Sequence, residues 1–142
     1  MSYDLMVFAL EHAPQQREPF LAWYQQQSQW KERHSYDDPQ VTTPELRAWF
    51  QEMIQEFPPL DGPLAPDIEA EDFDEELEDR LTGYCIGKSV IYASFAWSEA
   101  EMAYRHVKDL AARHKVGFFD ASSNSLEIWL PTPEGNSEKV TT

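Results

Sequence analysis

The spacing of hydrophobic positions changes from segment to segment along the 142 residues of the chain. The first apolar run, SYDLMVFAL at residues 2–10, is hydrophobic on both faces of an extended backbone. Leu5 and Val7 would share one face, and Met6 and Phe8 would share the other. Such a run is typical of a strand that is covered on both sides of a sheet. The pattern therefore predicts a central strand at the start of the chain.

Two segments with apolar positions three or four residues apart follow this strand and predict two helices. Residues 15–30 place several aromatic side chains near one stripe, and residues 43–57 give the stronger helical signal. In the second segment Thr43 suits the N-cap and Pro44 suits the first helical position. We expect its apolar face to be mostly buried, and this face consists of Leu46, Trp49, Phe50, Met53 and Ile54.

A hairpin and a third helix are predicted in the second half of the chain. The β-rich runs at residues 81–87 and 88–97 meet at Gly87 and Lys88, which would form the turn between two neighbouring strands of a hairpin. Ser98 and Glu101 have the spacing of a capping box, and the helical pattern that follows reaches as far as residue 114.

Two short strands at residues 116–121 and 126–131 flank the turn SSNS and complete the predicted fold. Gly117 lies close to where a C-cap glycine of the preceding helix would sit. We expect residues 132–142 to form a frayed, flexible tail. The predicted order is β-α-α-β-β-α-β-β. It indicates one α+β domain over residues 1–131: a sandwich of the split βαβ kind, in which about three helices pack on four to five mostly antiparallel strands.

Charge is the unusual feature of the composition, because 26 acidic residues face 11 basic ones and give a net charge of −15. Residues 61–80 hold ten of the acids and a single base, Arg80, and we expect them to form an acidic loop within the domain. A field of this sign repels nucleic-acid phosphates and anionic lipids, and it attracts basic proteins. The chain is therefore not expected to bind nucleic acid or membranes.

The acidic window imitates half of a calcium-binding loop. Asp72, Asp74 and Glu76 have the alternate spacing of the first ligands. However, Leu77 stands where the loop needs glycine, and Gly83 stands where it needs a bidentate glutamate. A calcium site is thus not expected at these positions.

Two interpretations of the window remain. It is a solvated loop or short helix, docked through apolar positions at Phe73, Leu77 and Leu81, or it is a surface for a basic partner. The partner-binding carboxylates would then be those of Asp72, Asp74, Glu75, Glu76, Glu78 and Asp79.

Other candidate chemistry is sparse. The histidines (His12, His34, His106 and His114) lack the spacing of a zinc site, and the glycines are isolated, so no phosphate-binding loop is present. Cys85 lies within a predicted strand and is expected to be a buried, inert thiol. The segment HSYDDP at residues 34–39 offers acid-base groups, but a turn with Asp37 and Asp38 as backbone acceptors is the simpler interpretation. We therefore expect no metal and no other cofactor.

The compartment is predicted from what the chain lacks. One cysteine cannot form an internal disulfide, and the first ten residues have an acidic side chain where a secretory signal needs a basic one. No apolar run approaches the roughly 20 residues that cross a bilayer. These features favour a cytoplasmic location.

Several phrases of the chain carry a resemblance: MSYDLMVF, TPELRAWFQEMIQEFPPLDGP, YCIGKSVIYASFAWSEAE, HKVGFFDASS and IWLP. The chain resembles a family of small acidic bacterial proteins that begin with MSYDLMVF and occur in multiple divergent copies. The resemblance covers most of residues 1–131 and transfers no catalytic residue. In their habit such proteins are similar to the immunity proteins of polymorphic and contact-dependent toxin systems, in which an acidic protein plugs a basic toxin domain.

The charge argument and the resemblance lead to one hypothesis. A nuclease toxin must be basic to hold nucleic acid, so an acidic inhibitor competes for the same Lys and Arg side chains. We expect a non-enzymatic binding protein that neutralises such a toxin. The alternative is an enzyme or small-ligand binder that uses the loop from His34 to Asp38 and an aromatic pocket formed by Trp23, Tyr24, Trp49 and Trp97.

Overall fold

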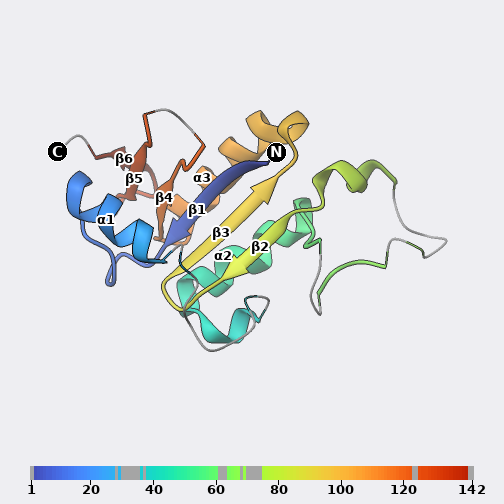
Figure 1. Ribbon diagram of the computed structural model, residues 1–142, viewed down its shortest axis with the longest axis horizontal. Helices are drawn as coiled ribbons and strands as arrows, with labels where there is room; N and C mark the ends of the chain where they lie inside the picture. The colour runs from blue at the N-terminus through green and yellow to red at the C-terminus, as the bar shows by residue number, and fades with distance from the viewer. Residues whose placement is uncertain are drawn as a thin grey trace.

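Six strands form one antiparallel sheet in the part of the protein that the computed structural model describes (Figure 1). That part comprises residues 2–27, 29, 36, 38–60, 64–67, 69, 75–122 and 125–140, with the side chains of residues 75–77 excepted. Across the sheet the strands are β2 (Gly83–Ile86), β3 (Val90–Phe95), β1 (Tyr3–Phe8), β4 (Gly117–Phe119), β5 (Ile128–Pro131) and β6 (Ser137–Lys139). Every neighbouring pair is antiparallel.

The connections between the strands confirm the predicted α+β fold and its order. The helices are α1 (Arg17–Gln27), α2 (Pro44–Glu56) and α3 (Ala100–Arg113), with short 3-10 turns η1 (Pro39–Val41), η2 (Glu75–Arg80) and η3 (Trp97–Glu99). The strands β1 and β2 run parallel with β3 between them, and β3 and β4 run parallel with β1 between them. These are two interleaved split βαβ units, the ferredoxin-like arrangement, extended by β5 and β6.

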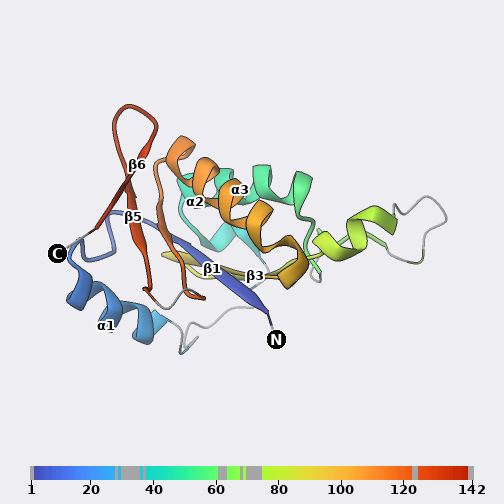
Figure 2. The same cartoon turned by 90° about the horizontal axis from the view of Figure 1, so that it is seen from above.

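The helices cover both faces of the sheet, as Figure 2 shows, with α2 and α3 on one face and α1 on the other. Among the described residues no helix is both long enough and apolar enough to cross a membrane.

The layer under α2 and α3 contains the larger hydrophobic cluster. Trp49 is fully buried there, and its indole Nε1 donates a hydrogen bond to the carbonyl of Val107 in α3, at 3.3 Å. The predicted apolar face of α2 is confirmed, since Leu46, Trp49, Phe50 and Met53 are buried and Ile54 is partly buried. The predicted N-cap is also confirmed, because the Thr43 hydroxyl accepts a hydrogen bond from the Leu46 amide.

A second, aromatic cluster lies between the sheet and α1. Phe20 of α1 is fully buried against Phe8 of β1 and Phe119 of β4, with ring centroids 4.7 and 5.2 Å apart. The central strand β1 therefore has apolar contacts on both faces, as its sequence predicts.

The predicted start of α3 is wrong in detail, whereas its predicted end is right to within one residue. No capping box forms: η3 precedes the helix, Glu99 occupies the N-cap without a side-chain hydrogen bond, and Glu101 pairs with Arg105 instead. At the other end Lys115, with φ of 60°, follows the C-cap His114 in the left-handed conformation, so the residue after the cap is not Gly117. Gly117 serves packing instead, because a Cβ built there would lie 2.1 to 2.7 Å from atoms of the Phe8 ring.

The predicted frayed tail is also wrong for residues 137–139, which form β6 on the edge of the sheet. Gly135, with φ of 86°, permits the turn between β5 and β6. Beyond β6 the Val140 amide donates to the Ile128 carbonyl at 2.8 Å, and the Val140 side chain packs on the aromatic cluster. These contacts make the sheet one strand larger than expected.

Replacing Trp49 by alanine should lower the free energy of unfolding by about 3 to 5 kcal/mol, because it leaves a cavity between α2 and α3. Chemical denaturation measures this loss. Trp97→Ala is the matched control, since half of that side chain is exposed, and it should cost about 1 kcal/mol or less. Equal losses for the two variants would contradict the packing described above.

Gly117→Ala should lower the free energy of unfolding by about 1 to 3 kcal/mol, because the added methyl group would overlap the buried Phe8 ring. Gly83→Ala is the control. At that position the nearest atom to an added Cβ is 3.9 Å away, so stability should stay the same or rise slightly. Thermal melts of both variants test the comparison, and an unaffected Gly117→Ala would show that Phe8 can move aside.

Candidate functional site

The six acidic residues predicted to bind a partner are only partly within the described structure. Asp72 and Asp74 lie outside it, and Glu75 and Glu76 belong to η2, where their side chains are not described. The side chains of Glu78 and Asp79 are exposed to solvent. Figure 1 places η2 at one end of the molecule, next to the end of α2 and the start of α3.

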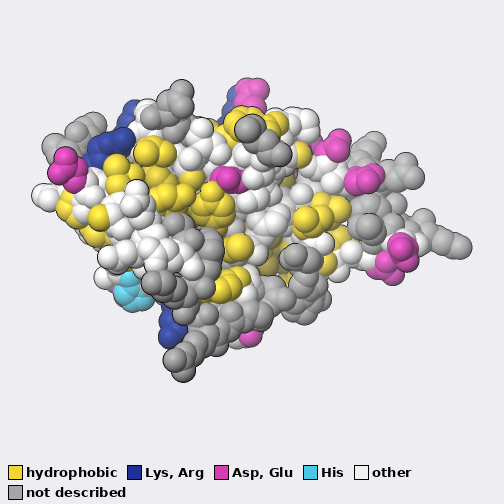
Figure 3. Space-filling view, viewed as in Figure 1, with side chains coloured by type: hydrophobic (Ala, Val, Ile, Leu, Met, Phe, Trp, Pro, Cys, Tyr) yellow, Lys and Arg dark blue, Asp and Glu magenta, His cyan; other side chains and the backbone are white. Residues whose placement is uncertain are grey.

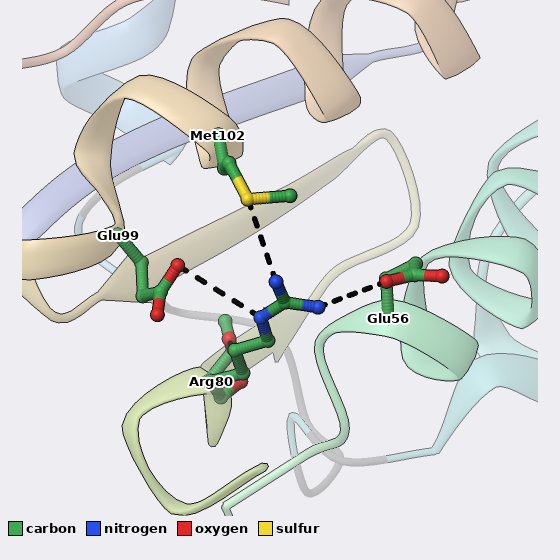
Figure 4. A network of polar contacts seen from close by, with 5 residues as sticks. Glu56, Arg80, Glu99 and Met102 are labelled. Atoms are coloured by element: carbon green, nitrogen blue, oxygen red, sulfur yellow. Dashed lines mark hydrogen bonds and ion pairs between the residues drawn. The ribbon is translucent and has the colours of Figure 1, made fainter. Parts of the chain in front are cut away.

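Arg80, the single base of the acidic window, is bound by side chains from three other elements (Figure 4). Its Nη1 donates to Glu56 Oε2 in α2 at 3.0 Å, and its Nε lies 3.8 Å from Glu99 Oε2 in η3. Its Nη2 contacts the sulfur of Met102 at 3.4 Å, and its guanidinium carbon lies 5.7 Å from the centroid of the Phe57 ring. The positive charge of Arg80 is thus neutralised within the protein, and the neighbouring carboxylates of η2 keep their negative field.

Large apolar side chains are exposed at the same end of the protein. In the described part of the chain the exposed large hydrophobic residues are Leu60, Leu64, Trp97 and Met102, with 48 to 59% of their surface accessible. Met102 contacts Arg80. The amide of Leu60 donates to the carbonyl of Thr82, which lies two residues after Arg80 in the chain. In Figure 3 acidic side chains gather toward this end, and most of the visible Lys and Arg side chains lie elsewhere. Exposed apolar groups with a polar, charged rim are a feature of protein-interaction sites.

A pocket of about 370 Å³ opens beside the first turns of α3. Its described lining consists of Tyr3, Ala100, Glu101, Tyr104 and Arg105. Tyr3 begins the central strand, and its ring lies 5.1 Å from that of the exposed Trp97. In the helical projection Ala100 and Tyr104 lie on the side of α3 away from Met102, and Arg105 lies between, so the pocket and the Arg80 network occupy adjoining sides of one helix start.

Glu127 holds the Tyr104 wall of this pocket in place. Its Oε1 accepts hydrogen bonds from the Tyr104 hydroxyl at 2.9 Å and from the Trp129 indole at 3.1 Å. The Trp129 and Tyr104 donors lower the pKa of the Glu127 carboxyl, whereas its partial burial acts in the opposite direction. Burial and the Glu127 carboxylate raise the pKa of Tyr104 to about 12, so this phenol remains neutral. Lys108 lies over the Trp129 ring in a cation-π contact, with its Nζ 3.6 Å from the ring centroid.

The aromatic pocket of the alternative hypothesis does not form. Trp23 and Tyr24 pack in the cluster under α1, whereas Trp49 is buried on the opposite face of the sheet. Trp97 lies at the start of α3 on Tyr3. The four side chains therefore share no cavity.

The loop at residues 34–38 is described only at Tyr36 and Asp38; His34, Ser35 and Asp37 lie outside the described residues. The Asp38 carboxylate accepts a hydrogen bond from the Gln40 amide at 2.9 Å and caps η1. The Tyr36 carbonyl accepts from the Ile86 amide at the edge strand β2. Asp38 thus has the role of a backbone acceptor, as the simpler interpretation predicts.

The histidines with described side chains lie apart. His12 bonds Ser89, His114 bonds Glu52, and His106 packs near Phe57, where burial lowers its pKa. Within the described ranges no group of three His, Cys, Asp or Glu side chains is placed to hold a metal. Cys85 lies in β2, half-buried rather than buried.

Searches against protein-family models, curated protein sequences and solved structures found no match to this chain. The fold defines the class, an α+β protein with split βαβ units.

Glu127→Gln should lower the free energy of unfolding by about 1 kcal/mol near neutral pH, because two hydrogen bonds to a charged acceptor weaken. A carboxyl with a lowered pKa stabilises the folded state above its unfolded pKa. The difference from wild type should therefore be full above about pH 5 and shrink as the pH falls through the lowered pKa. Denaturation at a series of pH values measures it.

Glu134→Gln is the control for this pH series, since Glu134 lies exposed in the β5–β6 turn. It should show no such pH-dependent difference. If Glu127→Gln cost the same at all pH values, the carboxylate would not be the group that stabilises Tyr104.

Proposed function

We propose that this protein is a non-enzymatic, cytoplasmic binding protein that neutralises a basic, nuclease-like bacterial toxin domain through its acidic surface. In this role it would be an immunity protein. Its resemblance in sequence to small acidic multi-copy bacterial proteins supports the same proposal.

One observation supports the proposal most: exposed carboxylates and exposed apolar side chains occur together at the end of the protein formed by η2, η3 and the start of α3. Glu78 and Asp79 are exposed, and Arg80 beside them is already paired with Glu56 and Glu99. An approaching basic surface would therefore meet uncompensated negative charge. The neighbouring Trp97 and Met102 offer the apolar contact area that charged groups alone lack.

The separation of the four aromatic residues removes the main support for an enzyme with an aromatic pocket. Trp23 and Trp49 lie on opposite faces of the sheet, and each is part of a hydrophobic cluster. Packing explains both residues without a ligand.

A double substitution tests the acidic surface. Glu78→Gln with Asp79→Asn should slow association with the toxin domain about threefold or more at low ionic strength, and the effect should fade at high salt. Stability should stay the same or rise, because repulsion with neighbouring carboxylates decreases. The partner for this measurement is a toxin-like open reading frame adjacent to the gene, and growth protection in cells that express it is the second readout.

Glu134→Gln with Glu138→Gln is the matched control, because it removes the same charge from exposed positions of the β5–β6 hairpin. It should change the association rate far less. If both double variants bind at the wild-type rate and protect fully, the acidic window is a solvated loop and the toxin is bound through another surface. If wild type neither binds nor protects, the proposed function is wrong. A metabolic operon around the gene would favour an enzyme instead.

A further inference from the structure

We propose that the pocket beside the start of α3 receives an apolar side chain, preferably an aromatic one, from a basic segment of the partner. This inference rests on the proposed function and adds a second contact to it. The acidic window attracts the partner, and the pocket formed by Tyr3, Ala100, Tyr104 and the stems of Glu101 and Arg105 anchors it.

The chemistry of the walls selects an apolar group. Two tyrosine rings and an alanine methyl group form the pocket, and the Tyr104 hydroxyl is already bonded to Glu127 rather than free for a ligand. The pocket is shallow and wide open to solvent, and its volume of about 370 Å³ is large enough for one face of a Leu, Phe or Trp side chain to lie on it. The exposed Trp97 ring, tilted at 57° on Tyr3, provides a further aromatic surface beside the pocket.

The charges around the start of α3 favour a basic segment around that anchor. Five carboxylates lie at this end of the described structure, those of Glu56, Glu78, Asp79, Glu99 and Glu101. They face two guanidinium groups, Arg80 and Arg105, both already engaged in ion pairs, and one ammonium group, Lys108, whose Nζ lies 5.8 Å from the Tyr104 ring centroid. The surplus is negative, so it complements Lys and Arg side chains and repels acidic ones.

Arg105 does not close the pocket to a basic partner. Its ion pair with Glu101 joins two side chains that are 75% and 86% exposed, a type of pair that contributes little stability. A Lys or Arg of the partner can replace Arg105 at Glu101 at small cost. Two of the walls are held by the fold, because Tyr3 belongs to the central strand and the Tyr104 hydroxyl donates to Glu127.

Three short blocked peptides test the inference without knowledge of the natural partner: KKWKK, KKAKK and EEWEE. Titration of each into the isotope-labelled protein is followed by NMR. We expect KKWKK to shift the resonances of Ala100 to Arg105 and to bind about tenfold more tightly than KKAKK, because the indole is buried. EEWEE should bind more weakly than KKWKK, and added salt should reduce this difference.

Variants connect the binding to the pocket. Trp97→Ala should weaken KKWKK binding about threefold or more, because this ring lies beside the pocket on Tyr3, while Asn136→Ala, an exposed position in the β5–β6 turn, should leave it unchanged. Both positions are surface-exposed, so the fold survives either change. Equal binding of KKWKK and KKAKK, shifts at another surface, or no binding of any peptide would overturn the inference.

The proposed function and this inference can fail separately. If KKWKK occupies the pocket but no basic toxin domain is bound or neutralised, the proposed function is wrong. If a toxin domain is bound with the expected salt dependence and Trp97→Ala leaves its dissociation rate unchanged, the pocket is not the anchor.

Discussion

The central strand β1 is the constraint on which the rest of the structure depends. Its side chains are apolar on both faces, so the sheet cannot leave either side of this strand in water. On one face α2 and α3 cover it, and on the other face the aromatic side chains of α1 do so. Phe8 needs so much room that its neighbour in β4 has to be glycine, Gly117. One strand thus determines where all three helices pack and how closely the adjacent strand approaches.

A second constraint acts on the charges. The window at residues 61–80 has ten acids, and its one base binds to Glu56 and Glu99 instead of neutralising the window. This arrangement connects the end of η2 to α2 through Glu56 and to the start of α3 through Glu99. The carboxylates of Glu78 and Asp79 remain in water. An ion pair with partly exposed partners adds little stability. Its larger effect is geometric, because it places the acidic segment beside the exposed apolar side chains.

The sequence predicts the layers of this fold well because they depend on hydrophobic periodicity, which is a local property. The buried face of α2 and the two-sided burial of β1 are confirmed. Errors occur where distant contacts decide. Residues 137–139 look like a tail by composition, yet they pair with β5, and the predicted capping box at Ser98 gives way to η3. The pocket could not be found either, because Tyr3 and Tyr104 are about one hundred positions apart and no motif links them.

The two flanks of the α3 start separate two physical tasks that one surface cannot perform equally well. Carboxylates act over roughly a Debye length, about 8 Å at physiological ionic strength, so they accelerate encounter but discriminate poorly among basic partners. An apolar pocket acts only at contact, so it contributes to lifetime and selectivity rather than to encounter. In the proposed role, the acidic flank would bring a basic segment close, and the adjoining flank with Tyr3 and Tyr104 would test its shape.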